Sequence, residues 1–302
     1  MKQRFQRLED GLERRFDKYL RIPYAHRLFN DINILDSFQS IQYIVEHKCS
    51  VSRFGDGELI MMLGGGYKDY QDADENLARR LKDVLVSTDV PNHILGLPLP
   101  LKCTSGLRES SREFWDYFTL RKGKMILPYL SGKRKYVDTQ LSRFYIMYKD
   151  KRRCAEQLEI LRRIWEGKDI VIVEGTKSRT GIGNDLYNNA NSIKRILGPA
   201  TDAFSQYEKM LATIQNKVAT EKLSLLSYGP TATILAYDLA KLGFWAIDIG
   251  HLDIEYEWFL QEATDSIAVK GKFTNENKDG HVVDDCSDAT SLSQIIADIT
   301  TE

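Results

Sequence analysis

Two carboxylates separated by one residue follow a short β-capable run in the first quarter of the chain. Asp56 and Glu58 lie between glycines in the segment Arg53-Phe-Gly-Asp-Gly-Glu58. In near-extended backbone, residues two apart project to the same side, so both carboxylates could bind one hard divalent cation such as Mn²⁺ or Mg²⁺. With Arg53 beside it and Gly55 allowing a close backbone approach, that cation would neutralise a diphosphate leaving group. The alternative is a plain turn with a solvated acidic tip, because turns favour glycine and aspartate for local reasons.

A second group of acid–base side chains lies in the last sixth of the chain. It follows an apolar run and comprises His251, Asp253, Glu255 and Glu257. If a helix begins there, His251 and Glu255 share one face and the other two share a neighbouring face; if the segment is extended, all four align. We predict that Glu255 is a general base for a hydroxyl nucleophile and that His251 orients it, although the acidic residues could exchange roles. The alternative is an acidic helix start stabilised by the helix dipole.

A glycine-rich turn follows the apolar run at 169–174 and combines an arginine with an Asn-Asp pair. Such a turn suits phosphate or sugar hydroxyls, and the alternative is a solvated loop. Its candidate donor-binding residues are Glu174, Gly175, Arg179, Gly183, Asn184 and Asp185.

Another turn places a proline and two hydroxyls at the head of an apolar helix. The residues are Gly229, Pro230, Thr231 and Thr233. A helix start directly after a strand is a ready anion site, so we predict that a diphosphate lies between this helix head and the arginine turn. Ordinary threonine capping is the alternative.

Alternating strands and helices must position these side chains. The patterns predict strands at 49–54, 94–97, 123–128, 169–174, 192–197, 223–227 and 244–250. They predict helices at 1–20, 36–47, 75–86, 105–119, 136–148, 154–166, 202–216 and 234–242, with a loop at 21–35. This alternation predicts an α/β fold with a mostly parallel sheet flanked by helices. The amphipathic helix 1–20 could pack on the main domain or on a second copy of the chain, giving a homo-oligomer.

Composition restricts the class of protein and its partners. The 302 residues are 42% hydrophobic, enough for a large core, and 42 Lys and Arg residues nearly balance 43 Asp and Glu residues. Near-neutral charge gives no reason to expect nucleic acid as the partner. The four cysteines form no Cys-X-X-Cys pair, which indicates the cytoplasm, and no apolar run approaches the roughly 20 residues of a membrane span.

Taken in order, four motifs resemble the GT-D glycosyltransferase family of bacterial adhesin-glycosylation and surface-polysaccharide clusters. They are Arg53 to Glu58, Glu174 to Leu186, Gly229 to Thr233 and Asp248 to Trp258, and the resemblance continues to Gly271-Lys-Phe-Thr-Asn-Glu276. The resemblance implies a Rossmann-like core of the family's own type, a UDP-sugar donor, and a divalent metal held through Asp56 and Glu58. It implies an N-terminal helical extension at 1–35, the transferase domain at 36–277, and a C-terminal tail at 278–302.

The leading hypothesis is therefore transfer of a hexose, with glucose preferred, from a UDP-sugar to a hydroxyl of a glycan or glycoprotein acceptor. One alternative is a non-catalytic subunit that binds a nucleotide sugar or polysaccharide. Another is a metal-dependent phosphohydrolase, which would also need clustered carboxylates. The intact Asp56, Glu58 and Glu255 favour catalysis.

Overall fold

The computed structural model describes residues 13–66, 70–88 and 90–301. Within these ranges the strands form one nine-stranded sheet in the order β1-β4-β3-β2-β8-β7-β5-β6-β9. Every registered strand pair in it is parallel, so the predicted α/β fold with a mostly parallel sheet is confirmed. The strands are β1 (Asn33–Ile34), β2 (Ser50–Arg53), β3 (His93–Leu97), β4 (Lys135–Asp138), β5 (Asp169–Gly175), β6 (Ser192–Gly198), β7 (Leu223–Ser227), β8 (Trp245–Asp248) and β9 (Ile295–Asp298).

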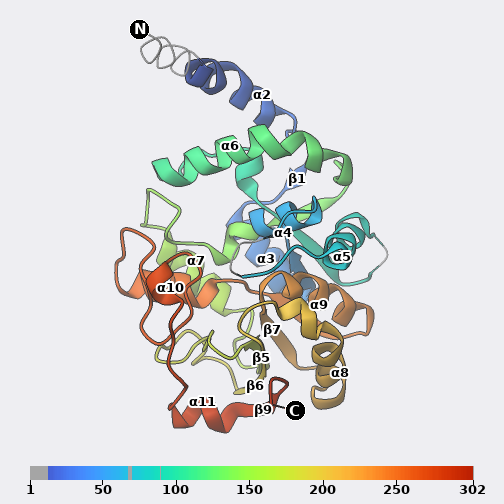
Figure 1. The fold of residues 1–302 in the computed structure, drawn as a ribbon, viewed down its shortest axis with the longest axis vertical. Helices are drawn as coiled ribbons and strands as arrows, with labels where there is room; N and C mark the ends of the chain where they lie inside the picture. The colour runs from blue at the N-terminus through green and yellow to red at the C-terminus, as the bar shows by residue number, and fades with distance from the viewer. Residues whose placement is uncertain (1–12, 67–69, 89, 302) are drawn as a thin grey trace.

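Helices cover both faces of the sheet, with α5, α8 and α9 on one side and α7 and α10 on the other (Figure 1). Helix α9 packs on β2 and β8, and α3 packs on β4. The α-helices are α2 (Ile22–Arg27), α3 (Ser37–His47), α4 (Asp56–Met62), α5 (Glu75–Val86), α6 (Glu109–Ile126), α7 (Cys154–Arg162), α8 (Tyr207–Lys217), α9 (Gly229–Lys241), α10 (Leu252–Leu260) and α11 (Ala289–Gln294).

Local sequence explains the elements that were predicted best. Strand β5 contains a continuous apolar run whose side chains are at most 1% exposed, as expected for a strand buried on both faces. Helix α5 begins where predicted because the Asp74 carboxylate accepts a hydrogen bond from the Leu77 N–H at 2.8 Å. Helix α3 begins at a capping box formed by Asp36 and Gln39.

Two predicted elements were wrong. The segment 123–128 is not a strand, because α6 continues to Ile126 and a 3₁₀ turn follows at Leu127–Tyr129. The segment 136–148 is not a helix, because its first residues pair with β1 and β3 as β4 and a 3₁₀ turn follows at Thr139–Ser142. In both places tertiary packing overrode the local pattern.

The two terminal segments differ from their predicted roles. Of the helix predicted at 1–20, residues 1–12 lie outside the described part of the chain, and the predicted loop at 21–35 contains α2 and β1. Phe16 and Leu20 are 48% and 57% exposed, so they do not pack on the main domain, and a homo-oligomer through this helix stays a prediction. The expected tail at 278–302 includes α11 and β9, and β9 extends the sheet beside β6.

No helix within the described ranges is long and apolar enough to cross a membrane. All four cysteines, Cys49, Cys103, Cys154 and Cys286, carry free thiols.

Candidate functional site

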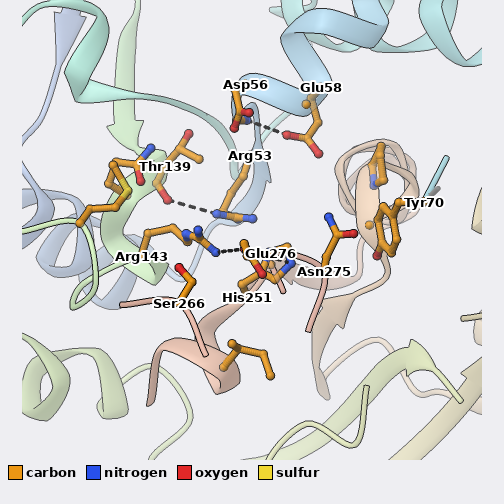
Figure 2. A pocket seen from close by; sticks show the side chains of 18 of the residues that line it. Arg53, Asp56, Glu58, Tyr70, Thr139, Arg143, His251, Ser266, Asn275 and Glu276 are labelled. Carbon is orange, nitrogen blue, oxygen red and sulfur yellow. Dashed lines mark hydrogen bonds and ion pairs between the residues drawn. The ribbon is translucent and has the colours of Figure 1, made fainter. Parts of the chain in front are cut away.

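A pocket of about 460 Å³ opens at the carboxyl ends of the parallel strands. Residues that follow β2, β4, β5, β7 and β8 all contribute to its walls, together with the start of α6 and the loop at 266–276. Figure 2 shows this pocket with Arg53 near its centre. Parallel α/β sheets bind ligands at this edge, where the strand order reverses, so the pocket lies where a ligand is expected.

Arg53 ends β2 and is fixed by neighbours from across the sheet. Its Nε lies 3.2 Å from Asp248 Oδ1, and its Nη1 donates to Ser142 Oγ at 2.7 Å. Gly250 has φ +47°, and a Cβ added there would lie only 1.8 Å from Arg53 Nη2. A residue with a side chain would therefore displace the guanidinium.

Asp56 and Glu58 line the pocket, but the expected extended geometry is wrong. Both residues lie in the first turn of α4, where residues two apart do not face each other. Glu58 Oε2 accepts a hydrogen bond from the Gly55 N–H at 2.7 Å, so one of its oxygens caps the helix. Burial raises the pKa of Glu58 to about 7, with Asp248 adding to the shift.

The surroundings of Asp56 disfavour the ionised form of its carboxyl group. Burial raises its pKa, Arg143 opposes this shift, and Glu276 adds to it. A divalent cation would offset the cost of ionising this buried acid and its repulsion by Glu276. Within the described residues, no group of three His, Cys, Asp or Glu side chains forms a complete metal site. Asp56 and the second oxygen of Glu58 are the carboxylate groups at this helix start that could serve as ligands to a cation, and phosphate oxygens of a bound ligand would have to complete its shell.

Helix α10 begins at the late acidic motif, so the helical alternative for 251–257 is confirmed. Only His251 and Asp253 of the four predicted catalytic residues line the pocket. Asp253 and Glu257 both accept from Lys272 Nζ, at 2.7 and 2.8 Å, and both accept from Asn184 Nδ2. These bonds tie the glycine-rich turn and the 272 loop to α10.

Glu255 has no exposed surface. Its Oε2 accepts from the N–H groups of Tyr145 and Ile146 at 3.0 and 2.9 Å, and its Oε1 lies 3.3 Å from Arg143 Nε. Burial raises its pKa, and Arg143 opposes this shift. The carboxylate holds the 143–146 loop. The sequence had predicted it as a base near the acceptor hydroxyl, but in this geometry no acceptor hydroxyl could reach it.

His251 and Glu276 form a pair inside the pocket. His251 Nε2 lies 3.7 Å from Glu276 Oε1, and the imidazole side chain is 33% exposed. The pocket walls withhold water from the imidazole and lower the pKa of His251, although Glu276 opposes this shift. Burial would raise the pKa of Glu276, but His251 and Arg143 lower it to about 2. At neutral pH the imidazole is therefore neutral and the carboxylate is ionised.

The six predicted donor-binding residues of the glycine-rich turn do not line this pocket in the described structure. Glu174 is buried against Arg195 at 2.5 Å and accepts from the Thr180 N–H at 2.7 Å. Arg179 Nη1 donates to the Gly271 carbonyl at 2.8 Å. The others are Gly175 beside a second small cavity, Asn184, which donates to Asp253 and Glu257 of α10, and the exposed Gly183 and Asp185. They shape the turn, and its Ser178 and Thr180 supply the pocket wall instead.

The predicted helix head divides into two roles. Gly229 and Pro230 line the pocket, at the start of α9. Thr231 and Thr233 are fully buried. Thr233 Oγ1 donates to the Arg53 carbonyl at 2.8 Å and so joins α9 to β2.

Several pocket residues were not predicted from sequence. Arg143 lies between Glu276 at 2.5 Å and Glu255 at 3.3 Å, and these carboxylates raise its pKa although burial would lower it. Asn275 and Glu276 end the Gly271-to-Glu276 segment, which the sequence singled out without assigning it a role. Tyr70 covers Gly229, and its ring stacks on Phe273 with centroids 6.0 Å apart. These residues come from loops with no periodic pattern.

Comparisons with known proteins agree with one another. The family model described as "Glycosyltransferase GT-D fold" matches residues 51–277. The chain is 37% identical over 266 residues to "Glycosyltransferase GlyD" of Streptococcus pneumoniae, covering 86% of this chain and 32% of that protein. It is 36% identical over 273 residues to "Probable glycosyl transferase Gly" of Streptococcus gordonii, covering 90% of this chain and 39% of that protein. The chain thus spans between a third and two fifths of the length of these curated relatives.

Solved structures resemble the whole fold. One is a domain of unknown function 1792 described as having "a distinct glycosyltransferase fold", with TM-score 0.84, 34% identity, and coverage of 91% of this chain and 98% of the other. Another is "A New Glycosyltransferase" from Streptococcus sanguinis, with TM-score 0.82, 33% identity, and coverage of 88% and 99%.

Proposed function

The chain belongs to the GT-D glycosyltransferase family, and we propose that it transfers a hexose from a UDP-sugar to a hydroxyl of a glycan or glycoprotein acceptor. The observation that carries this proposal is that one pocket combines the start of helix α9, the side chains of Arg53 and Arg143, and His251 with its lowered pKa. A diphosphate, a sugar and a hydroxyl nucleophile each find suitable groups there.

The donor diphosphate is best accommodated at the start of α9. This helix begins at Gly229, separated from the end of β7 by one residue, and Gly229 and Pro230 line the pocket, so the positive end of the helix dipole favours an anion there. The hydroxyls of Ser178 and Ser227 line the same wall. Arg53 lies close by and adds positive charge, although its Nε and Nη1 are already engaged.

A divalent cation, Mn²⁺ or Mg²⁺, would be held by Asp56 and Glu58. When bound, it would supply positive charge that stabilises the departing diphosphate. Asp56 is suited to this role because burial and Glu276 raise its pKa, which disfavours the ionised acid in the absence of a cation. Glu58 must lose its proton to take part, since its pKa is about 7.

His251 is the side chain best placed to accept the proton of the acceptor hydroxyl. It lines the pocket, and its lowered pKa keeps the imidazole neutral at neutral pH. Glu276, ionised and 3.7 Å away, would stabilise the imidazolium that forms. This proposal differs from the prediction from sequence, in which Glu255 was the base and His251 oriented it, because Glu255 holds the 143–146 loop and His251 lines the pocket beside Glu276.

The test is nucleotide release by the purified chain with Mn²⁺ and a panel of UDP-sugars that includes UDP-glucose. Release that rises when an acceptor glycoside is added supports transfer. Asp56→Asn should abolish the metal-dependent release. Asp83→Asn, which changes an acid that is 60% exposed on α5, should not.

Two other outcomes would overturn the proposal. Saturable UDP-sugar binding with no turnover under any acceptor would indicate a binding subunit. Free phosphate released from simple phosphoesters, with no acceptor dependence, would indicate a phosphohydrolase.

A further inference from the structure

One wall of the pocket carries an exposed aromatic ring. Phe114 on α6 is 48% exposed, and among the exposed large apolar side chains of the described residues it is the one that lines the pocket. Met125, on the same helix and 49% exposed, lies away from it. An exposed apolar surface inside a ligand pocket is typical of a surface that a ligand covers.

The Phe114 ring is held in a fixed orientation. It meets the Trp115 ring edge to face, with centroids 5.4 Å apart and an interplanar angle of 85°. It also stacks on Phe118 with centroids 6.0 Å apart. Trp115 and Phe118 are only 3% and 7% exposed, so they form a buried base under the exposed ring. The ring is thus a preformed platform.

Polar groups surround this platform. Arg108 Nη1 donates to the Thr264 carbonyl at 3.0 Å, and the Arg108 N–H donates to the Met147 carbonyl at 2.8 Å. These bonds join the start of α6 to two loops that also line the pocket. The hydroxyls of Ser110, Ser111 and Ser266 lie in the same lining.

Phe114 lies on the side of the pocket opposite the start of α9, where the donor diphosphate is proposed to bind. Figure 2 places Tyr70, which covers the start of α9, and Arg143 on opposite sides of Arg53. Met147, four residues after Arg143, is bonded to the start of α6 beside Phe114. A ligand on Phe114 would therefore approach the centre of the pocket from the side opposite the donor.

We propose that Phe114 and the serine hydroxyls around it form the acceptor subsite, and that its occupant is the pyranose ring of a glycan. This inference rests on the proposed transferase function. A pyranose has an apolar C–H face, which an aromatic ring covers, and an edge of hydroxyls, which serines and Arg108 can bind. An unglycosylated serine or threonine side chain has no comparable face to cover the ring.

The experiment measures steady-state transfer at saturating donor to methyl pyranosides, methyl disaccharides and sugar-free peptides with serine or threonine. Phe114→Ala should raise the acceptor KM roughly tenfold, as expected for the loss of one aromatic contact, and should change the donor KM far less. Phe114→Tyr should keep the wild-type KM because it retains the ring. Met125→Ala is the matched control and should change neither KM.

The proposal is overturned if Phe114→Ala leaves the glycoside KM unchanged, or if sugar-free peptides are the better acceptors and respond equally to the substitution. If the wild-type chain turns over no donor, the proposed function fails separately. Saturation-transfer NMR of methyl pyranosides with wild type and Phe114→Ala then decides the subsite. Signal lost in the variant supports it, and equal or absent signal in both refutes it.

Discussion

Replacing His251 with glutamine should remove the proton acceptor while leaving a polar group of similar reach in the pocket. Because a general base contributes about 10²- to 10⁴-fold to turnover, His251→Gln should lower kcat by that factor. The donor KM should change little, since the proposed diphosphate position lies at α9. Glu276→Gln should have a smaller effect, because Glu276 acts on the imidazole rather than on the substrate.

Glu255 provides the comparison, since the sequence predicted it as the base. In Glu255→Gln the side-chain oxygen can still accept from the Tyr145 and Ile146 N–H groups, which lie 3.0 and 2.9 Å away. That variant should stay folded and retain turnover within about tenfold. Glu255→Ala leaves both buried N–H groups unpaired at about 1–3 kcal/mol each, so its free energy of unfolding should fall by about 2–6 kcal/mol.

The assays are nucleotide release as a function of pH and urea unfolding of each variant. Burial lowers the pKa of His251 below 6.5, so at saturating UDP-sugar and Mn²⁺, where the bound cation keeps Glu58 ionised, wild-type kcat should fall when the pH drops below that lowered value, and His251→Gln should lose this acidic limb. The same shift means that the stability contributed by His251 is present above pH 6.5 and is lost as the pH falls through the lowered pKa. Full activity in His251→Gln, with a 10²- to 10⁴-fold loss in a stable Glu255→Gln, would refute this reasoning and restore Glu255 as the base.

Four further predictions concern the donor and the turns around it. Asp56→Ala combined with Glu58→Ala should abolish Mn²⁺-dependent UDP binding in calorimetric titration without unfolding the protein, although loss of the Glu58 cap should lower the unfolding midpoint slightly; unchanged affinity would refute the metal assignment. Since the pKa of Glu58 is about 7, Mn²⁺-dependent UDP affinity should rise as pH increases through about 7, and Glu58→Gln should flatten that rise. Gly250→Ala would place a Cβ 1.8 Å from Arg53 Nη2, so UDP affinity should fall roughly tenfold; a variant with wild-type affinity would contradict the close packing. Arg179→Ala removes the 2.8 Å bond to the Gly271 carbonyl, so amide exchange near 271 should accelerate, whereas unchanged exchange would show that this bond does not order the turn.

The buried strands could be predicted because each is a short apolar run bounded by turn residues. Strand β7 has its predicted bounds, and the bounds of β5 and β8 lie within two residues of those predicted. The strand β4 could not be predicted, because it has two apolar residues and exists through pairing with β1 and β3. The segment at 123–128 reads as a strand, yet Gly123 sits under the Phe29 ring inside a helix, where a Cβ would lie 3.0 Å from that ring.

Part of the site could be predicted because the predicted strands fix where the pocket lies. Residues at strand ends, such as Arg53, Asp56 and Gly229, do line the pocket, since parallel strands bring their carboxyl ends together. Polar residues in the turn at 174–185 were predicted to bind the donor, but most of them bond to the protein itself. Sequence alone does not distinguish a polar group that meets a ligand from one that supports the wall. Arg143 lay within the segment wrongly predicted as a helix and Glu276 in a loop without a pattern, and only folding places them together at 2.5 Å.

The seam between β2 and β8 has a consequence for how this chain is synthesised and folds. The two strands meet through a single registered pair, Val51 with Ile247, supported by the bond from Ala246 N–H to Ser50 Oγ at 2.9 Å. Contacts between residues nearly 200 positions apart are slow to form, because the loop entropy is lost before the contact stabilises the chain. The pocket straddles this seam, so its two halves should remain apart on the ribosome until β8 has emerged. A nascent chain stalled before that point should bind no donor, however well its first strands have formed.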